Sequence, residues 1–131
     1  MSGCPGTPDG GQYPNWVTHP WQPEYIELLN WQWEQRVEPY WRDLGSYAAG
    51  QGIKVAIEAH PGQVVYNTRT LLQLREIVGS HLGANFDPSH FFYQGIDPHL
   101  VIRHLDPGSI FHVHAKRSEE HTSELQSHLN L

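Results

Sequence analysis

The sequence predicts an α/β fold in which parallel strands are connected by helices. Segments whose apolar residues recur every three or four positions alternate along the chain with short segments in which apolar and polar residues alternate. This order of helix and strand, repeated three times, favours parallel strands joined by crossover helices. Each strand-like segment also ends on a side chain that can bind a metal ion, and ligands gather at such strand ends in parallel α/β folds.

The N-terminal third of the chain predicts a loop followed by a long helix. Residues 1–22 are rich in Gly and Pro, and Trp16 and Trp21 can either cover a site or close a hydrophobic edge. From Pro23 a helical stripe of apolar residues follows, made of Ile26, Leu29, Trp33, Val37, Trp41, Leu44 and Ala48. Pro39 predicts a kink or a break near residues 36–38, and the helix is expected to end around Gly50–Gly52.

The remaining chain alternates predicted strands with shorter helices. The strands are expected at residues 53–60, 81–87 and 110–116. Between the first two, "NTRTLLQLREIVG" predicts a helix that is capped by Asn67 or Thr68 and ends at Gly79. Between the last two, "DPHLVIRHLDPG" predicts a short helix with Asp97 as its cap and a Pro-Gly pair at its end.

Metal-capable side chains stand at the end of each predicted strand. They are Glu58, Asp87 and His114, separated by intervals of 29 and 27 residues, about one strand-plus-helix unit each. Alternation along the strands places each of them opposite the main apolar residues, so that in a barrel all three point into the lumen. The residues expected to face the helices are Ile53, Val55, Ile57, Leu82, Ala84, Phe86, Phe111 and Val113. Ile110 is expected on the ligand face.

Two carboxylates and an imidazole suit a hard-to-borderline divalent cation, and the lack of thiolates disfavours a structural zinc site. We therefore expect Mn²⁺, Co²⁺ or Mg²⁺ ahead of Zn²⁺. Such an ion can hold two oxygens of a sugar and polarise a carbonyl, which acidifies the neighbouring C–H, and a carboxylate at the site can then move the proton.

Each of these residues also has an ordinary interpretation. Glu58 can cap a helix or pair with Lys54, Asp87 can be a turn residue before a proline, and His112 and His114 can be hydrogen-bonded core residues. The shared spacing and parity favour the metal site. The histidines expected to reach the same mouth as substrate contacts are His60, His90 and His112.

Composition narrows the function classes. The chain has 131 residues with 8 Lys+Arg against 14 Asp+Glu, an acidic balance that disfavours nucleic-acid binding. It lacks an apolar run of about 18 residues, so we expect no membrane span. The single cysteine, Cys4, cannot form an internal disulfide, which favours a reducing cytoplasm.

Three motifs, "VAIEAHPG", "GANFDPSHFFYQGIDP" and "IFHVHAK", resemble those of the sugar phosphate isomerase/epimerase group of the xylose isomerase-like TIM barrels. "GCPG" near the start is similar to a loop that follows an earlier strand in that group. The resemblance covers about residues 2–116. It implies a partial (β/α)8 TIM barrel that comprises about the fifth to seventh strands with their connecting helices.

The resemblance also implies the site. In that family a divalent metal lies at the barrel mouth, held by Glu, Asp, His and a final Glu, and Glu58, Asp87 and His114 match the first three. It implies that Glu58 also acts as an acid/base residue on a small sugar or polyol. In endonuclease-type relatives a histidine three residues after the Asp binds metal, which implies His90 as a further ligand. The final strand with its ligand Glu is missing, and Arg117 stands where the family usually has Asp.

The stretch "RSEEHTSELQSH" at residues 117–128 resembles the translation of a common sequencing adapter. We therefore expect a partial barrel domain at 1–116 and a non-native tail at 117–131. The alternative is a native charged helix after the last strand. On the adapter interpretation, the isolated chain is expected to be marginally stable and to aggregate or dimerise, because strand edges lack their neighbours. The full-length protein is expected to form a homo-oligomer.

The sequence thus predicts a fragment of a metal-dependent sugar or polyol isomerase, epimerase or dehydratase. One alternative is an endonuclease-IV-like, metal-dependent DNA repair hydrolase, which shares the Asp-x-x-His spacing but needs a basic surface. For the 131-residue chain itself, as distinct from its parent protein, we expect poor metal binding and no catalysis.

Overall fold

The computed structural model describes residues 23–106 and 108–115. Its elements are α1 (Pro23–Gln32), the π-helical segment η1 (Trp33–Val37), α2 (Glu38–Gly50), β1 (Val55–Ile57), α3 (Thr68–Val78), β2 (Leu82–Phe86), α4 (Pro88–Tyr93), α5 (Pro98–His104) and β3 (Ile110–Val113). The predicted loop at 1–22, with Cys4, Trp16 and Trp21, lies outside the described residues, as does the predicted tail at 117–131. These two predictions stay predictions.

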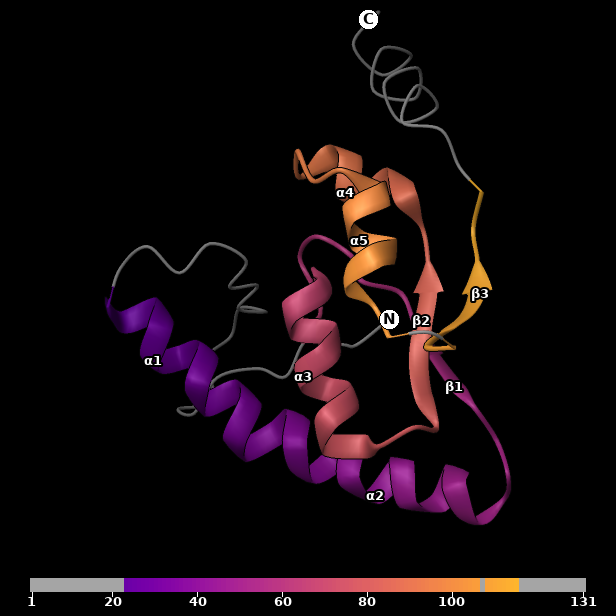
Figure 1. The fold of residues 1–131 in the computed structure, drawn as a ribbon. Coiled ribbons are helices and arrows are strands. Elements are labelled where there is room, and N and C mark those ends of the chain that lie inside the picture. Colours follow the sequence, from indigo (N-terminus) through magenta and orange to yellow (C-terminus); the bar gives the residue numbers. More distant parts are fainter. Residues whose placement is uncertain (1–22, 107, 116–131) are drawn as a thin grey trace, which may run out of the picture.

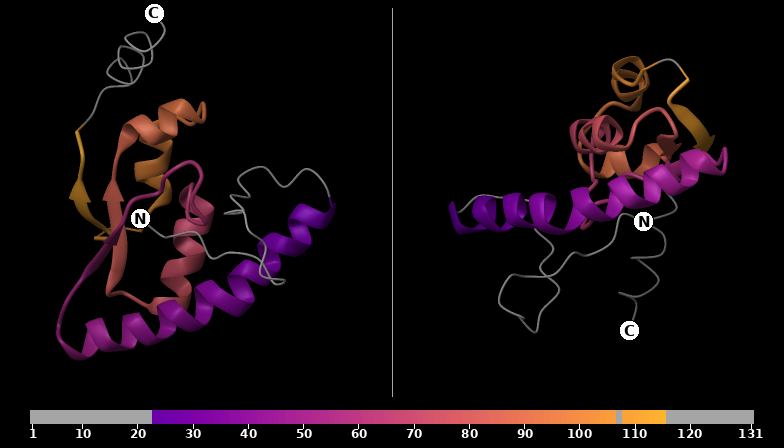
Figure 2. Two further views of the ribbon diagram at one scale, coloured as in Figure 1. Left: turned by 180° about the vertical axis from the view of Figure 1, so that it is seen from behind. Right: turned by 90° about the horizontal axis from the view of Figure 1, so that it is seen from below.

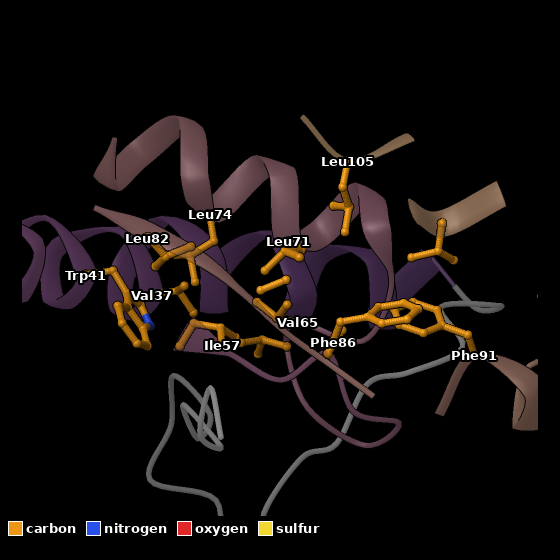
Figure 3. Packing of buried hydrophobic residues seen from close by; sticks show 14 of the residues in the cluster. Val37, Trp41, Ile57, Val65, Leu71, Leu74, Leu82, Phe86, Phe91 and Leu105 are labelled. Carbon is orange, nitrogen blue, oxygen red and sulfur yellow. The ribbon is translucent and has the colours of Figure 1, made fainter. Parts of the chain in front are cut away.

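The three strands form one parallel sheet in the order β1-β2-β3, with helices connecting successive strands (Figure 1). Buried apolar side chains fill the space between one face of this sheet and the helices (Figure 3). Ile57, Leu82 and Phe86 come from the sheet, and Leu71 and Leu74 come from α3. The predicted α/β fold with a parallel sheet is therefore confirmed.

The long helix at the N-terminal side is continuous through Pro39, since α1, η1 and α2 follow one another without a gap. The five residues before Glu38 form a π-helical turn, in which the Glu38 N–H donates to the Trp33 carbonyl. Pro39 has no N–H and its ring crowds the preceding turn, and the widened π-helical turn accommodates both effects. The predicted disturbance near residues 36–38 is thus present as a π-helical segment and not as a break.

In the apolar stripe of this helix, Trp33, Val37, Trp41 and Ala48 are buried and Leu29 and Leu44 are partly buried against the core, but the prediction fails at Ile26. Ile26 is 47% exposed. The reason is its position in α1, which extends past the sheet and the other helices (Figure 2). No helix among the described residues is long and apolar enough to cross a membrane.

The end of α2 corrects the predicted start of the first strand. Gly52, with φ of 67°, follows the helix, and the N–H groups of Gly52 and Ile53 donate to the carbonyls of Ala49 and Ala48. This is a Schellman motif, which glycine favours because the conformation is left-handed. Ile53 therefore belongs to the helix end and is 52% exposed, so it does not face the helices as predicted, and β1 begins only at Val55.

The pairing of β2 with β3 corrects the predicted faces of the third strand. Ala84 pairs with Ile110 and Asn85 pairs with His112, so Phe111 is an extra residue at a β-bulge. Because of the bulge, Ile110 packs against the hydrophobic core, opposite to the prediction. Phe111 instead lies over Gly83, where its ring atoms would be 2.7 Å from an added Cβ atom. Val113 is 51% exposed and is not a core residue.

The helices between the strands agree with the prediction in type and differ in one addition. Asn67 caps α3 through a capping box in which its side chain accepts from the Thr70 N–H and the Thr70 hydroxyl accepts from the Asn67 N–H. Asp97 caps α5, which ends at His104. Helix α4 was not predicted, because its six residues are too few to show a helical period.

Candidate metal centre

The predicted ligands Glu58, Asp87 and His114 are each the first residue after a strand of the sheet. Their side chains lie together at the carboxyl edge of the sheet. His114 Nδ1 lies 3.0 Å from Glu58 Oε2 and 4.0 Å from Asp87 Oδ2. The convergence that spacing and parity predicted is therefore present, even though the bulge reverses the faces of residues earlier in β3.

The two carboxylate oxygens of Asp87 contact different neighbours. Oδ1 accepts hydrogen bonds from the Ser89 N–H at 3.0 Å and from the Ser89 hydroxyl at 2.6 Å, which makes Asp87 the N-cap of α4. Oδ2 faces the cluster, 3.6 Å from His90 Nε2. The turn interpretation and the ligand interpretation of Asp87 are thus compatible, because each uses a different oxygen.

His90 enters the site from the first turn of α4. Its Nε2 donates to Glu58 Oε1 at 2.8 Å, and its ring is buried. Burial lowers the pKa of the His90 imidazole, and this outweighs the hydrogen bond with Glu58, which raises the pKa. The nearby His60 lowers the pKa further. The neutral imidazole that results is the form that binds a metal ion.

Glu58, Asp87 and His90 form a group whose possible ligand atoms all lie within 4.8 Å of one another. Two carboxylates at this separation repel each other, and a divalent cation between them removes the repulsion. Oxygen and imidazole ligands without a thiolate suit Mn²⁺, Co²⁺ or Mg²⁺. The donor set therefore fits a divalent cation, with His114 beside the group and in contact with Glu58.

Asn85 is a site residue that the sequence interpretation did not assign. Its Nδ2 donates to Glu58 Oε2 at 2.9 Å and lies 3.3 Å and 3.4 Å from the two ring nitrogens of His114. The available signal was its position two residues before Asp87, which puts both side chains on one face of β2. That signal was not used because an asparagine does not stand out as a ligand for this cation.

The other histidines predicted to contact the substrate lie at the border of the cluster. The His60 ring is 4.1 Å from the His90 ring, and its Nδ1 is 2.6 Å from the Pro61 carbonyl oxygen. His112 is exposed and its ring lies 5.2 Å from that of His114. Their contact with a substrate stays a prediction.

The pairing of Glu58 with Lys54, the ordinary alternative for this glutamate, does not occur among the described residues. The Lys54 ammonium lies over the Phe111 ring, 4.8 Å from its centre, at the opposite end of the strands from the cluster. Glu58 is in contact with His90 and His114 instead. Its carboxylate therefore belongs to the site and not to a surface ion pair.

Comparison with known proteins agrees with the parallel α/β fold. The "Uncharacterized protein YfiH" of Bacillus subtilis (strain 168) is 42% identical over 119 residues, which cover 88% of this chain and 38% of that protein. The chain thus spans less than half the length of this relative. Residues 4–131 match the family described as "Xylose isomerase-like TIM barrel", a range that runs past the predicted domain boundary at 116. Members of that family generally bind divalent metals. The chain belongs to the xylose isomerase-like TIM barrel family.

Proposed function

We propose that the chain is part of a divalent-metal-dependent enzyme that isomerises, epimerises or dehydrates a small sugar or polyol. The observation that carries this proposal is the convergence of Glu58, Asp87 and His90, with His114 in contact with Glu58, at the carboxyl ends of parallel strands. Family membership supports isomerase, epimerase or endonuclease-like chemistry in general. The acidic composition supports a small neutral or cation-bridged substrate over a nucleic acid.

In this proposal Glu58, Asp87 and His114 would hold the cation, and His90 would either be a further ligand or orient Glu58. A bound cation supplies Lewis acidity, which polarises a substrate carbonyl and makes the adjacent C–H more acidic. Glu58 takes that proton on a carboxylate oxygen, and the electron pair of the broken C–H bond moves toward the carbonyl. An isomerisation is complete when the neighbouring carbon takes up the proton and the hydroxyl group on the first carbon passes its own proton to the former carbonyl oxygen. An epimerisation is complete when a second acid on the opposite face protonates the first carbon and Glu58 keeps the proton that it removed.

His90 contacts Glu58, the proposed acid/base residue. Its Nε2–H donates to Glu58 Oε1 and fixes the direction of the carboxylate, and the imidazole itself is buried while the carboxylate is partly exposed. Because burial lowers the pKa of His90, the ring is neutral at pH 7 and does not compete with a cation through its own charge. Glu58 is thus the acid/base residue and His90 either ligates the ion or orients Glu58.

Cation binding is the first test. Titration of the 131-residue chain with Mn²⁺ in a calorimeter is expected to show one ion per chain, with E58Q and D87N each lowering the affinity more than about 100-fold, beyond the 10–100-fold typical of residues outside the ligand shell. The matched controls are E76Q and D43N, which change exposed carboxylates on α3 and α2. Unchanged affinity in both site variants contradicts the proposed centre.

Proton abstraction is the second test. The chain with Mn²⁺ is incubated with a panel of ketoses in D₂O, and incorporation of deuterium next to the carbonyl is followed by NMR. The proposal expects exchange that E58Q abolishes and E76Q retains. Weak Mn²⁺ binding together with absence of exchange supports the expectation that this chain binds metal poorly and is inactive, and tight Mn²⁺ binding without exchange contradicts the proposed proton abstraction by this chain. Hydrolysis of abasic DNA in place of sugar exchange supports the endonuclease-like alternative.

A further inference from the structure

We infer that Asn85 is a positioning residue of the cation site, because its side-chain amide holds Glu58 against His114 from the central strand of the sheet. This inference rests on the proposed function and adds a residue that is not itself a ligand. It concerns how the two outer strands are brought to one point, since Glu58 follows β1 and His114 follows β3.

The geometry places the amide between these two strands. Asn85 is on β2 and pairs with His112 of β3, one step before the end of the strand. Its Nδ2 is 2.9 Å from Glu58 Oε2, and both ring nitrogens of His114 are within 3.4 Å of the same atom. A single side chain therefore contacts one proposed ligand on each side of β2, while Asp87 stands two residues further along the same face.

The orientation of the amide follows from the chemistry of its neighbour. A carboxylate accepts hydrogen bonds and donates none, so Nδ2 and not Oδ1 must face Glu58. The amide is also neutral. A lysine or arginine in its place would hold the carboxylate equally well but would repel a divalent cation at the same point. Asparagine thus fixes Glu58 Oε2 without adding charge to the site.

The carbonyl end of the Asn85 side chain indicates that asparagine at this position does not serve to stabilise the fold. Asn85 Oδ1 is buried and has no hydrogen-bond partner within the described residues. A buried carbonyl without a partner is unfavourable, and an apolar side chain at the same position would avoid that cost. Gly83, the preceding residue on this face of β2, has no side chain that could form a hydrogen bond with Asn85 Oδ1. The hydrogen bond that Asn85 donates to Glu58, together with its contact with the His114 ring, accounts for an asparagine at this position.

The test compares N85A with the matched control N30A, which removes an exposed asparagine from α1. Mn²⁺ affinity is measured by calorimetry, the geometry of the bound ion by the Mn²⁺ electron paramagnetic resonance spectrum, and stability without metal by thermal melting. N85A is expected to weaken Mn²⁺ binding about 10–100-fold and to change the resonance spectrum, as removal of an outer partner of a ligand does. Its melting temperature without metal is expected to stay the same or rise, because the unpartnered carbonyl is gone.

A second variant, N85L, covers the case in which the small alanine side chain of N85A leaves a cavity that destabilises the fold. Leucine fills the position but has no hydrogen-bond donor. N85L is expected to show the same loss of affinity. Mn²⁺ affinity within twofold of the unchanged chain in both variants overturns the inference, as does loss of melting stability with unchanged affinity. If the unchanged chain itself does not bind Mn²⁺, the proposed centre fails. If it binds Mn²⁺ and only E58Q and D87N lose it, Asn85 alone has been misassigned.

Discussion

The two faces of β2 have opposite properties over the same residues. Leu82, Ala84 and Phe86 point toward the helices and are at most 6% exposed. On the other face, Asn85 contacts Glu58 and His114, and Asp87, just past the strand, faces the cation cluster. Apolar burial on the first face stabilises the fold. On the second face, two carboxylates lie close together and an amide carbonyl has no partner among the described residues, so the site costs stability.

Because the two faces of β2 differ in this way, we expect substitutions on the helix-facing side and on the site-facing side to affect different measured quantities. Substitutions on the helix-facing side are expected to change the free energy of unfolding without changing the cation affinity of the folded molecules. Substitutions on the site-facing side are expected to do the reverse. The following predictions test that separation in order of decreasing effect.

The largest effect is expected from the core beneath the sheet. Leu74 of α3 is fully buried among the apolar residues that face β2. L74A is expected to lower the free energy of unfolding by about 2–5 kcal/mol, through lost burial and a residual cavity. Urea denaturation measures this, and L100A, at a side chain that is 58% exposed on α5, is the control, expected within about 0.5 kcal/mol of the unchanged chain. A large loss of Mn²⁺ affinity in the folded L74A protein would contradict the separation.

Gly83 lies on the site-facing side of β2 and is closely packed, against Ser109 and Phe111. A Cβ atom there would collide with the Ser109 carbonyl oxygen and would lie 2.7 Å from the Phe111 ring. G83A is therefore expected to lower the free energy of unfolding by about 1–3 kcal/mol, since the bulged β3 must shift. The control is G50A at the end of α2, where an added Cβ atom meets nothing within 4 Å. Equal stability of the two variants would show that β3 moves freely at the bulge.

The smallest effect has the opposite sign. E58Q removes one of two close carboxylates and is expected to raise the free energy of unfolding without metal by about 0.5–2 kcal/mol, as is common where a site is relieved of its functional strain. The same variant is expected to lose Mn²⁺ binding. Urea denaturation with a chelator present measures the first effect, with E76Q as the control. Destabilisation by E58Q would mean that its contacts with His90 and His114 outweigh the repulsion.

Much of the fold was predictable because the deciding signals are local. The order of the strands and the asparagine cap of α3 follow from alternation and from hydrogen-bonding chemistry over a few residues, although the strands end at Ile57, Phe86 and Val113, one to three residues earlier than predicted. The positions of Glu58, Asp87 and His114 follow from them, because parallel strands place their carboxyl ends at one edge of the sheet.

The features that were missed depend on contacts between distant segments. The bulge at Phe111 depends on the absence of a side chain at Gly83, which lies on another strand. The exposure of Ile53 depends on its N–H closing α2. Helix α4 is set by a cap at Asp87 and a proline, and not by a periodic apolar face. Asn85 was missed because its importance arises from neighbours on β1 and β3, which one strand's sequence does not reveal.

Asp87 connects ion occupancy with the winding of α4. The same carboxylate caps that helix through Ser89 and faces the cluster with its other oxygen, and the first turn of the helix carries His90 into place. On the proposed function, ion binding and formation of the first turn of α4 would therefore be thermodynamically coupled, and each would stabilise the other by the same free energy. An ion in the site should slow hydrogen exchange at the amides of this turn, and fraying of the turn should hasten release of the ion. On the proposed function, formation of the short helix α4 would thus contribute to the affinity of the site for the ion.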